Sequence, residues 1–280
     1  MNNDANQKNN ILYLDCSMGS RSEMLVPALY ELLDEVERKS FIKQMDALVP
    51  GEVSVLVKPD EKCGILGTRF DVLVSSEEEC SGDGHEHSHE HSHEHVHHHE
   101  HEHAHGHHGH HSMTDVTNII EGFSGISDNV KDMAIDVYKI LADAESAVHR
   151  VPVSEIHFHE VGMMDAIFNI TAVCLLIDTL KVDKVYASPV RTGKGQIKCA
   201  HGILPVPAPS TANILIGIPT YAGDIDAEFC TPTGAALLKY FVSDFREQPA
   251  MTVRKIGYGM GNKDFDACNC VRALYGSAAI

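Results

Sequence analysis

Residues 156–165 read I-H-F-H-E-V-G-M-M-D, which places two imidazoles and two carboxylates in one short stretch. If residues 156–161 are extended, side-chain alternation puts His157 and His159 on one face and Phe158 on the other. Gly162 interrupts the run, and an apolar segment with helical spacing follows over residues 164–180. The stretch therefore predicts a strand that turns into a buried helix, with polar side chains at the turn.

Imidazoles and carboxylates are ligands that suit a borderline divalent metal. The candidate metal ligands here are His157, His159, Glu160 and Asp165. Two alternatives remain open: histidines near a strand end are often hydrogen-bonded structural residues, and Asp165 stands where a carboxylate favours the helix dipole. The zinc-protease helix H-E-x-x-H is not formed, because Met163 occupies the position of the second histidine.

A second feature favours metal chemistry. Residues 77–112 contain an acidic preface and then sixteen histidines interleaved with glutamate, serine and glycine. The segment has no apolar face, so we expect a disordered insertion, either a solvated spacer or a tether whose imidazoles bind nickel, zinc, copper or cobalt reversibly. The candidate ligands in it are His85, His87, His89, His91, His93, His95, His97, His98, His99, His101, His103, His105, His107, His108, His110 and His111.

Composition narrows the class of protein. The 280 residues carry 22 Lys and Arg against 40 Asp and Glu, a net charge of −18. This charge argues against nucleic acid and anionic membranes as partners, because both attract basic surfaces, and it favours cations. No apolar run reaches the roughly 18 residues of a membrane span, and no signal peptide is recognisable. Eight scattered cysteines indicate reduced thiols, so we expect a cytoplasmic protein.

The hydrophobic pattern predicts an α/β fold: a mixed sheet flanked by helices and interrupted once by the histidine tract. We expect segments 1–76 and 113–280 to pack as one domain around the insertion at 77–112. Asp128, Ser210 and Thr231 are the expected helix N-caps. The predicted strands cover residues 11–15, 52–58, 68–75, 184–190, 251–256 and 269–274, and the predicted helices cover residues 22–38, 41–49, 114–121, 128–149, 164–180, 210–216 and 232–245.

Three later segments carry candidate phosphate or substrate contacts. They are the basic glycine loop R-T-G-K-G at residues 191–195, the proline-rich run that begins at residue 201, and the helix start T-P-T-G at residues 231–234. Free N–H groups at a helix start, with a glycine that permits close approach, can bind a phosphate. An ordinary turn and an ordinary helix start are the alternatives. The candidate residues are Lys194, His201, Thr231, Thr233 and Gly234.

Together these segments resemble the LarC family, the nickel-insertion proteins of nickel-pincer cofactor biosynthesis. The resemblance extends over nearly the whole chain. It rests on L-Y-L-D at 12–15, H-F-H-E-V-G at 157–162 with D-A-I at 165–167, H-G-I-L-P-V-P-A-P at 201–209, E-x-x-T-P-T-G-A-A at 228–236 and I-G-Y-G-M-G at 256–261.

The resemblance implies an enzyme of the lyase class, a nickel chelatase or cyclometallase that uses CTP with Mg or Mn. Its substrate would be a pyridinium mononucleotide bearing two thiocarboxylates. Nickel gathered by the tract would pass to His157, His159, Glu160 and Asp165. Because formation of a nickel–carbon bond releases a ring proton, Glu160 or His159 would act as general base. The product would serve a lactate racemase-type apoenzyme, and the protein would form homo-oligomers.

Two departures from the family pattern affect these expectations. The opening loop of the family usually reads Gly-Asp-Met, whereas this chain has Ser22, Glu23 and Met24. Full-length members continue into a C-terminal domain associated with the nucleotide triphosphate. We therefore expect this chain to correspond to the N-terminal part, to need the C-terminal LarC portion as a partner, and to be incompletely active alone.

Two other functions fit part of the pattern. A nickel store or metallochaperone would explain the histidine tract but not the H-F-H-E, P-V-P-A-P and T-P-T-G segments. A metal-dependent hydrolase would use the same ligands with an open water position, and it would favour zinc in a stoichiometric site.

Overall fold

A seven-stranded mixed sheet organises the protein, which is described by a computed structural model over residues 9–74 and 111–279. The strand order is β11-β4-β1-β13-β12-β3-β2. β11, β4 and β1 are parallel, β13 is antiparallel to both β1 and β12, β12 meets β3 in parallel, and β3 forms a hairpin with β2. The bounds are β1 Asn10–Asp15, β2 Val53–Lys62, β3 Ile65–Val74, β4 Lys184–Ala187, β11 Val242–Phe245, β12 Met251–Met260 and β13 Cys270–Ala278.

Strand β1 joins the beginning, middle and end of the chain. Its sequence N-I-L-Y-L-D is apolar at four successive positions, and these four side chains are buried. Such a run suits a strand covered on both faces. Leu12 lies opposite Val185 of β4 on one side and Tyr275 of β13 on the other. The loop that follows β1 therefore starts from the middle of the sheet.

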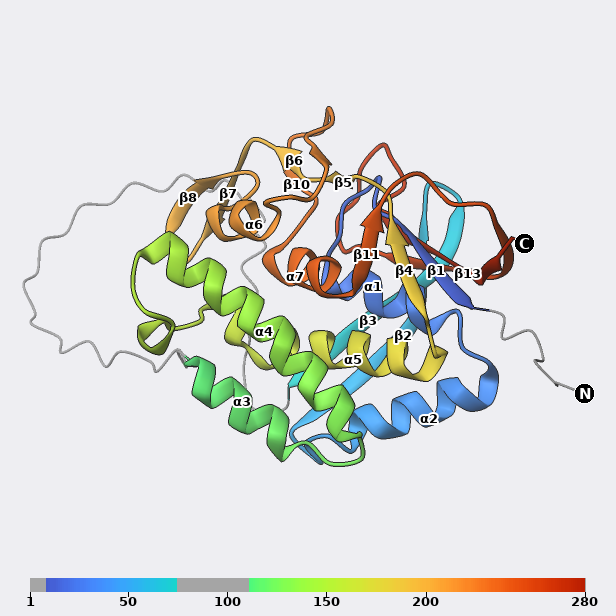
Figure 1. The fold of residues 1–280 in the computed structure, drawn as a ribbon, viewed down its shortest axis with the longest axis horizontal. Helices are drawn as coiled ribbons and strands as arrows, with labels where there is room; N and C mark the ends of the chain where they lie inside the picture. The colour runs from blue at the N-terminus through green and yellow to red at the C-terminus, as the bar shows by residue number, and fades with distance from the viewer. Residues whose placement is uncertain (1–8, 75–110, 280) are drawn as a thin grey trace, which may run out of the picture.

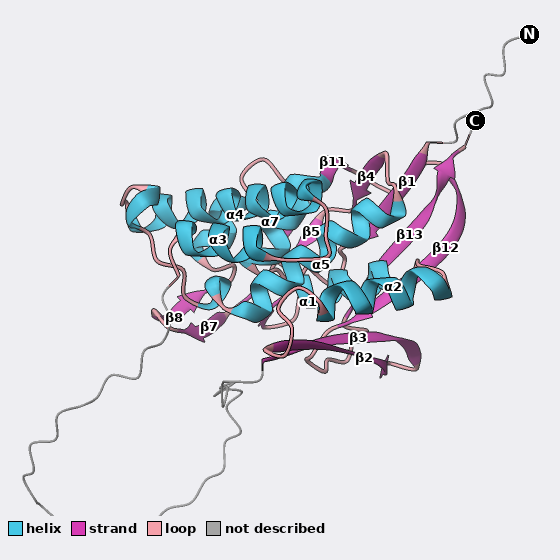
Figure 2. Ribbon diagram, turned by 90° about the horizontal axis from the view of Figure 1, so that it is seen from below, coloured by secondary structure: helices cyan, strands magenta, loops and turns pink. Residues whose placement is uncertain are grey.

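Helices pack together in a layer against the sheet (Figure 2), and β2 and β3 lie beneath α1 and α2 in that view. The central helix is α5, which is buried almost all round and contacts α1, α4 and α7. The bounds are α1 Ser22–Tyr30, α2 Glu35–Asp46, α3 Met113–Gly122, α4 Asp128–His149, α5 Met164–Leu180, α6 Pro209–Ile214 and α7 Pro232–Phe241, with short turns η1 Val153–Glu155 and η2 Glu160–Gly162.

Three two-stranded ribbons lie outside the main sheet. The ribbon of β7 and β8 forms a hairpin beyond the end of α4 (Figure 1). The other two pair β5 with β9 and β6 with β10, and they connect β4 to α7. The bounds are β5 Val190–Arg191, β6 Gly193–Lys194, β7 Gln196–Cys199, β8 Gly202–Pro205, β9 Thr220–Tyr221 and β10 Ala227–Glu228.

The predicted fold class is confirmed: a mixed sheet with packed helices, to which the parts before and after residues 75–110 both contribute strands. The described chain resumes at His111, two residues earlier than the predicted end of the insertion. His111 forms a bridge with Phe158, and Ser112 is the N-cap of α3. These two residues belong to the folded structure. The remaining tract, residues 77–110, lies outside the described residues.

Several predicted boundaries were wrong for local reasons. The helix predicted over residues 22–38 is divided between α1 and α2, because Asp34 and Glu37 form a capping box that starts a new helix. Helix α7 ends at Phe241, and the next four residues form β11 at the sheet edge. Residues 156–161 make a single bridge and then a turn rather than a strand.

Two of the three predicted N-caps were also wrong. Ser127 caps α4 in place of Asp128, because its side chain accepts the N–H of Val130. Helix α6 starts after Ala208, so Ser210 lies within it. The third, Thr231, caps α7 as predicted and accepts the N–H of Gly234.

Two chain-wide expectations can be checked on residues 9–74 and 111–279. All seven cysteines in this part are free thiols, as their scattered spacing predicts. No helix in this part is long and apolar enough to cross a membrane.

Substitution of Gly259 by alanine tests how closely α1 packs on the sheet. Gly259 lies in β12, and a Cβ atom there would collide with the carbonyl oxygen of Met24 in α1. We expect Gly259→Ala to lower the free energy of unfolding by about 1–3 kcal/mol, measured by urea denaturation. Gly122→Ala is the control: a Cβ atom there meets nothing, and alanine favours a helix. Equal stability of the two variants would contradict this close packing.

Candidate functional site

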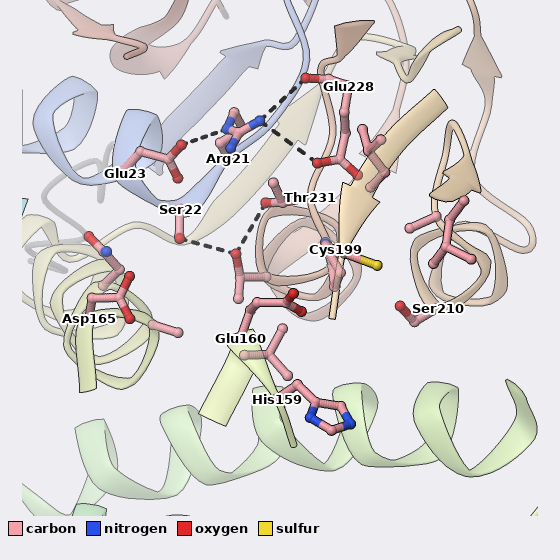
Figure 3. Close-up of a pocket in the computed structure, with 18 of the residues that line it drawn as sticks. Arg21, Ser22, Glu23, His159, Glu160, Asp165, Cys199, Ser210, Glu228 and Thr231 are labelled. Carbon is pink, nitrogen blue, oxygen red and sulfur yellow. Dashed lines mark hydrogen bonds and ion pairs between the residues drawn. The ribbon is translucent and has the colours of Figure 1, made fainter. Parts of the chain in front are cut away.

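One large cavity, with a volume of about 920 Å³, is lined by segments that are far apart in the sequence. The N-terminal ends of α1, α5 and α7 face it, together with η2, the last turns of α4 and the β7–β8 hairpin (Figure 3). Helix N-termini carry partial positive charge and unpaired N–H groups, which favour anions. The cavity therefore has the electrostatic character of an anion site at three of its edges.

Backbone contacts hold the starts of α1 and α7 together. The N–H of Ser20 donates to the carbonyl of Phe229 at 3.0 Å, and the N–H of Thr231 donates to the carbonyl of Ser20 at 3.2 Å. A Cβ atom on Gly234 would collide with that Ser20 carbonyl. The glycine in T-P-T-G thus has a packing reason: it permits two helix starts to approach one another.

Hydroxyl groups line this junction. The Ser22 and Thr233 hydroxyls are 3.1 Å apart, and the Thr233 and Thr231 hydroxyls are 3.2 Å apart. All three side chains line the cavity, and Figure 3 shows Ser22 and Thr231 among them. A row of hydroxyls at two helix N-termini can donate to phosphate or carboxylate oxygens.

Arg21 links α1 to β10 by charge. Its guanidinium contacts the Glu23 carboxylate at 2.5 Å, donates to the Glu228 carbonyl at 3.3 Å and lies 3.9 Å from the Glu228 carboxylate. Burial raises the pKa of Glu228, and the Arg21 charge only partly opposes that effect. One oxygen of Glu228, Oε1, is buried without a hydrogen-bond partner among the described residues. Glu228 is therefore a carboxyl group that can hold or accept a proton within the cavity.

The stretch at 156–165 is fixed in place by α4 and by His111. Ile156 and Phe158 are buried, and Phe158 packs edge-on against Tyr138 of α4. The Tyr138 hydroxyl donates to the carbonyl of Val161 at 2.8 Å, and the N–H of Phe158 donates to the carbonyl of His111 at 2.9 Å. The predicted alternation is therefore seen in burial: the apolar residues point inward and the histidines do not.

The two histidines of this stretch do not share a site. His159 lines the cavity, and its ring centroid is 4.7 Å from that of His201. His157 is exposed, is not among the cavity-lining residues, and lies near Asp115 of α3. The pKa of Asp115 is lowered mainly by hydrogen bonds from Ser112 and to a smaller degree by neighbouring histidines, His157 among them.

His201 contacts two other histidines, and the sequence did not predict this cluster. It stands on the turn between β7 and β8, and its ring also lies 5.0 Å from that of His149 at the end of α4. The N–H of Ala200, on the same turn, donates to Glu160 at 3.1 Å. We call His149, His159 and His201 the imidazole trio; all three line the cavity.

The structure divides the predicted site residues into three groups. His159, Glu160, Asp165, His201, Thr231 and Thr233 line the cavity. His157, Lys194 and Gly234 are not among its lining residues; Lys194 instead lies 3.8 Å from Asp226. The tract histidines from 85 to 110 lie outside the described residues. The Nδ1 atom of His111, the last of the sixteen, hydrogen-bonds to the Gly162 carbonyl at 2.8 Å.

The predicted four-ligand metal cluster is not assembled. Within residues 9–74 and 111–279, no group of three or more His, Cys, Asp or Glu side chains is arranged to hold a metal ion. One reason is that His157 does not line the cavity, whereas His159 does. Their positions two residues apart in the chain did not place them on the same surface.

Of the charged residues that line the cavity, sequence reasoning named only Glu160 and Asp165 as site residues. The cavity carries three cations, from Arg21, Lys198 and Lys263, against six carboxylates. The carboxylates belong to Glu23, Asp71, Glu145, Glu160, Asp165 and Glu228. Glu228 could have been noticed in E-x-x-T-P-T-G, whereas the two lysines stand in no motif. The excess of carboxylates favours a divalent cation, while the helix starts and lysines favour anionic groups.

Comparison with known proteins assigns the chain to a family. A family model described as "Nickel insertion protein" matches residues 12–279. The chain belongs to the nickel insertion protein family. The resemblance to the LarC family is thereby confirmed, and the matched range includes all the residues that line the cavity.

Curated relatives in the nickel insertion protein family bear the name "Pyridinium-3,5-bisthiocarboxylic acid mononucleotide nickel insertion protein". One from Clostridium acetobutylicum is 41% identical over 95% of this chain and 64% of its own length. Others from Clostridium kluyveri and Geobacillus kaustophilus are 37% and 36% identical, and the match covers 62% and 59% of their lengths. The chain thus spans about three fifths of the relatives it matches. No solved structure matches it.

The pKa of Glu228 gives a pH test of the site. Because the folded pKa lies above the unfolded pKa, the folded protein binds more protons between the two values, and stability falls as pH rises through that window. We expect Glu228→Gln to raise the melting temperature at pH 7, where the buried charge is removed. The gain should shrink below pH 4, where both states are protonated. A lower melting temperature at pH 7 would instead mean that the attraction of Arg21 outweighs burial.

Proposed function

We propose that this protein inserts nickel into pyridinium-3,5-bisthiocarboxylic acid mononucleotide and that the 920 Å³ cavity binds this substrate. One observation carries the proposal. In this member of the nickel insertion family, a single cavity contains three helix N-termini, an excess of carboxylates and the imidazole trio. Such a cavity suits a substrate that brings anionic arms and receives a divalent cation.

The anionic arms have natural partners at the helix starts. A mononucleotide carries a phosphate, and each thiocarboxylate is an anion. The Ser22, Thr231 and Thr233 hydroxyls at the α1–α7 junction suit one such group, and the exposed lysines Lys198 and Lys263 suit another. Asn169, in the second turn of α5, adds a carboxamide oxygen that is buried without a partner among the described residues and can accept from a ribose hydroxyl.

Nickel insertion requires transfer of the metal and loss of a proton. Thiocarboxylate sulfur is a softer donor than carboxylate oxygen, so sulfur can take nickel from an oxygen and nitrogen environment. When nickel bonds to the ring carbon, the carbon–hydrogen bond breaks and its proton must go to a base. Glu160 and His159 remain the candidates that the sequence suggested. Glu228 joins them, because burial raises its pKa and so favours the protonated carboxyl group more than in an exposed glutamate.

The remaining parts of the proposal rest on the family resemblance. They are the use of CTP with Mg or Mn, the lyase-type cyclometallase chemistry, and a contribution from the C-terminal LarC portion. Delivery of the product to a lactate racemase-type apoenzyme and self-association have the same basis, whereas a cytoplasmic location rests on the scattered cysteines. Each concerns the whole protein, of which this chain spans about three fifths by comparison with the relatives.

A nickel store is the second candidate function. It is favoured by the sixteen histidines of the tract. A store has no need of a cavity with three helix N-termini, so binding of the mononucleotide separates the two functions.

Removal of two positive charges from the cavity tests whether the cavity binds the mononucleotide. We expect the double variant Lys198→Gln, Lys263→Gln to bind the pyridinium mononucleotide roughly tenfold more weakly, measured by titration calorimetry at low salt. Each exposed ion pair contributes at most about 1 kcal/mol, and salt weakens it. No measurable binding by the unmodified chain would instead favour the store.

Lys194→Gln is the matched control, because it removes the same charge from a lysine beside Asp226 that does not line the cavity. We expect its affinity to equal that of the unmodified chain. A loss confined to Lys194→Gln would restore the basic glycine loop as the phosphate contact and would contradict the assignment to the cavity lysines.

A further inference from the structure

One member of the imidazole trio lies next to the last residue of the histidine tract, His111. The tract ends at His111, whose carbonyl accepts the N–H of Phe158 and whose Nδ1 atom contacts the Gly162 carbonyl. His159 is the residue next to Phe158, and it lines the cavity. The last tract histidine is therefore anchored beside one member of the trio.

The imidazole trio offers enough nitrogen donors for a weak metal site, but not the three or four arranged ligands of a closed metal site. His159 and His149 both contact His201, with ring centroids 4.7 and 5.0 Å from it, yet no three donor side chains in the described part of the chain are arranged around one point. His201 is exposed on a hairpin turn, so rotation of its side chain can direct a ring nitrogen toward His159. Two imidazoles, with water completing the coordination shell, would hold a borderline metal.

The surrounding charge favours a cation at this place. The His149 ring lies 3.5 Å from the Glu145 carboxylate, and Glu160 accepts a hydrogen bond from the turn that carries His201. These two carboxylates attract a divalent ion without taking part in a preformed cluster. Of the three cavity cations, Arg21 and Lys263 stand near Glu228, and Lys198 lies on β7 of the hairpin that carries His201.

We propose that His159 and His201, with His149 packed behind His201, form a transfer site that holds nickel at the cavity wall. The thiocarboxylate sulfurs of the substrate then displace the imidazoles, so the metal changes ligands without any change of oxidation state. This inference rests on the proposed function for the identity of the recipient. Two imidazoles suit the role because a closed site of three or four protein ligands would retain the cargo.

Histidine footprinting on the full chain tests the transfer site despite the tract. Diethyl pyrocarbonate modifies accessible imidazoles, and mass spectrometry of peptides resolves each position. With Ni²⁺ in excess over all histidines, we expect modification of His159 and His201 to be largely lost, while His157 reacts as before. Mg²⁺, which prefers oxygen ligands, should protect neither. Equal reactivity of His159 and His201 with and without Ni²⁺ would overturn the proposal.

Variants then show whether the two imidazoles act together. In the His201→Gln variant, we expect that nickel no longer protects His159 from modification. In the His159→Gln variant, we expect that nickel no longer protects His201. His157→Gln is the matched control, since it removes an imidazole two residues away that does not line the cavity, and both protections should persist in it. Protection of His159 that survives His201→Gln would contradict a shared site.

Mononucleotide binding, measured by calorimetry on the same samples, separates this inference from the proposed function. If the unmodified chain binds the mononucleotide but nickel protects neither His159 nor His201, the transfer site is wrong and the substrate assignment stands. If nickel protects both histidines but the mononucleotide does not bind, the substrate assignment fails and the recipient named here fails with it.

Discussion

The backbone contact between Ser20 and the segment 229–234 is the constraint on which the site depends. It joins a loop that leaves β1, an interior strand of the sheet, to the start of α7, more than two hundred residues later in the chain. The approach is close enough that Gly234 cannot carry a side chain. Because two helix starts meet there, their unpaired N–H groups and hydroxyls face one cavity, and Arg21 comes within reach of Glu228.

The cavity combines opposite electrostatic tendencies in a small space. Arg21 and Lys263 lie near Glu228, and so do the carboxylates of Glu23 and Glu160. Lys198 stands on the same β7–β8 hairpin as His201, while Glu145 lies beside His149 at the end of α4. Burial raises the pKa of Glu228 despite its arginine neighbour, so the cavity also includes a group suited to proton transfer.

Much of the fold could be predicted from local pattern. The apolar run at β1, the paired alternation of β2 and β3, and the spacing of α4 and α5 each depend on neighbours in sequence, and each prediction was confirmed. Boundaries failed where a side chain decided them, as at Asp34 and Ser127, or where sheet pairing overrode helical spacing, as at β11. The site was less predictable, because Lys198, Lys263 and Glu145 stand in no motif.

Residue types and short spacings were enough to predict the α/β class, the family, and the imidazoles and carboxylates of residues 156–165, because each depends on motifs that are local in the chain. Which of these side chains lie together depends on how distant segments pack. His157 and His159 are two residues apart but do not share a site. His149, His159 and His201 lie together although residues 149 and 201 are about fifty residues apart in the chain. The physical reason is that side-chain direction is local, while the surface that a side chain reaches is set by how helices and hairpins pack.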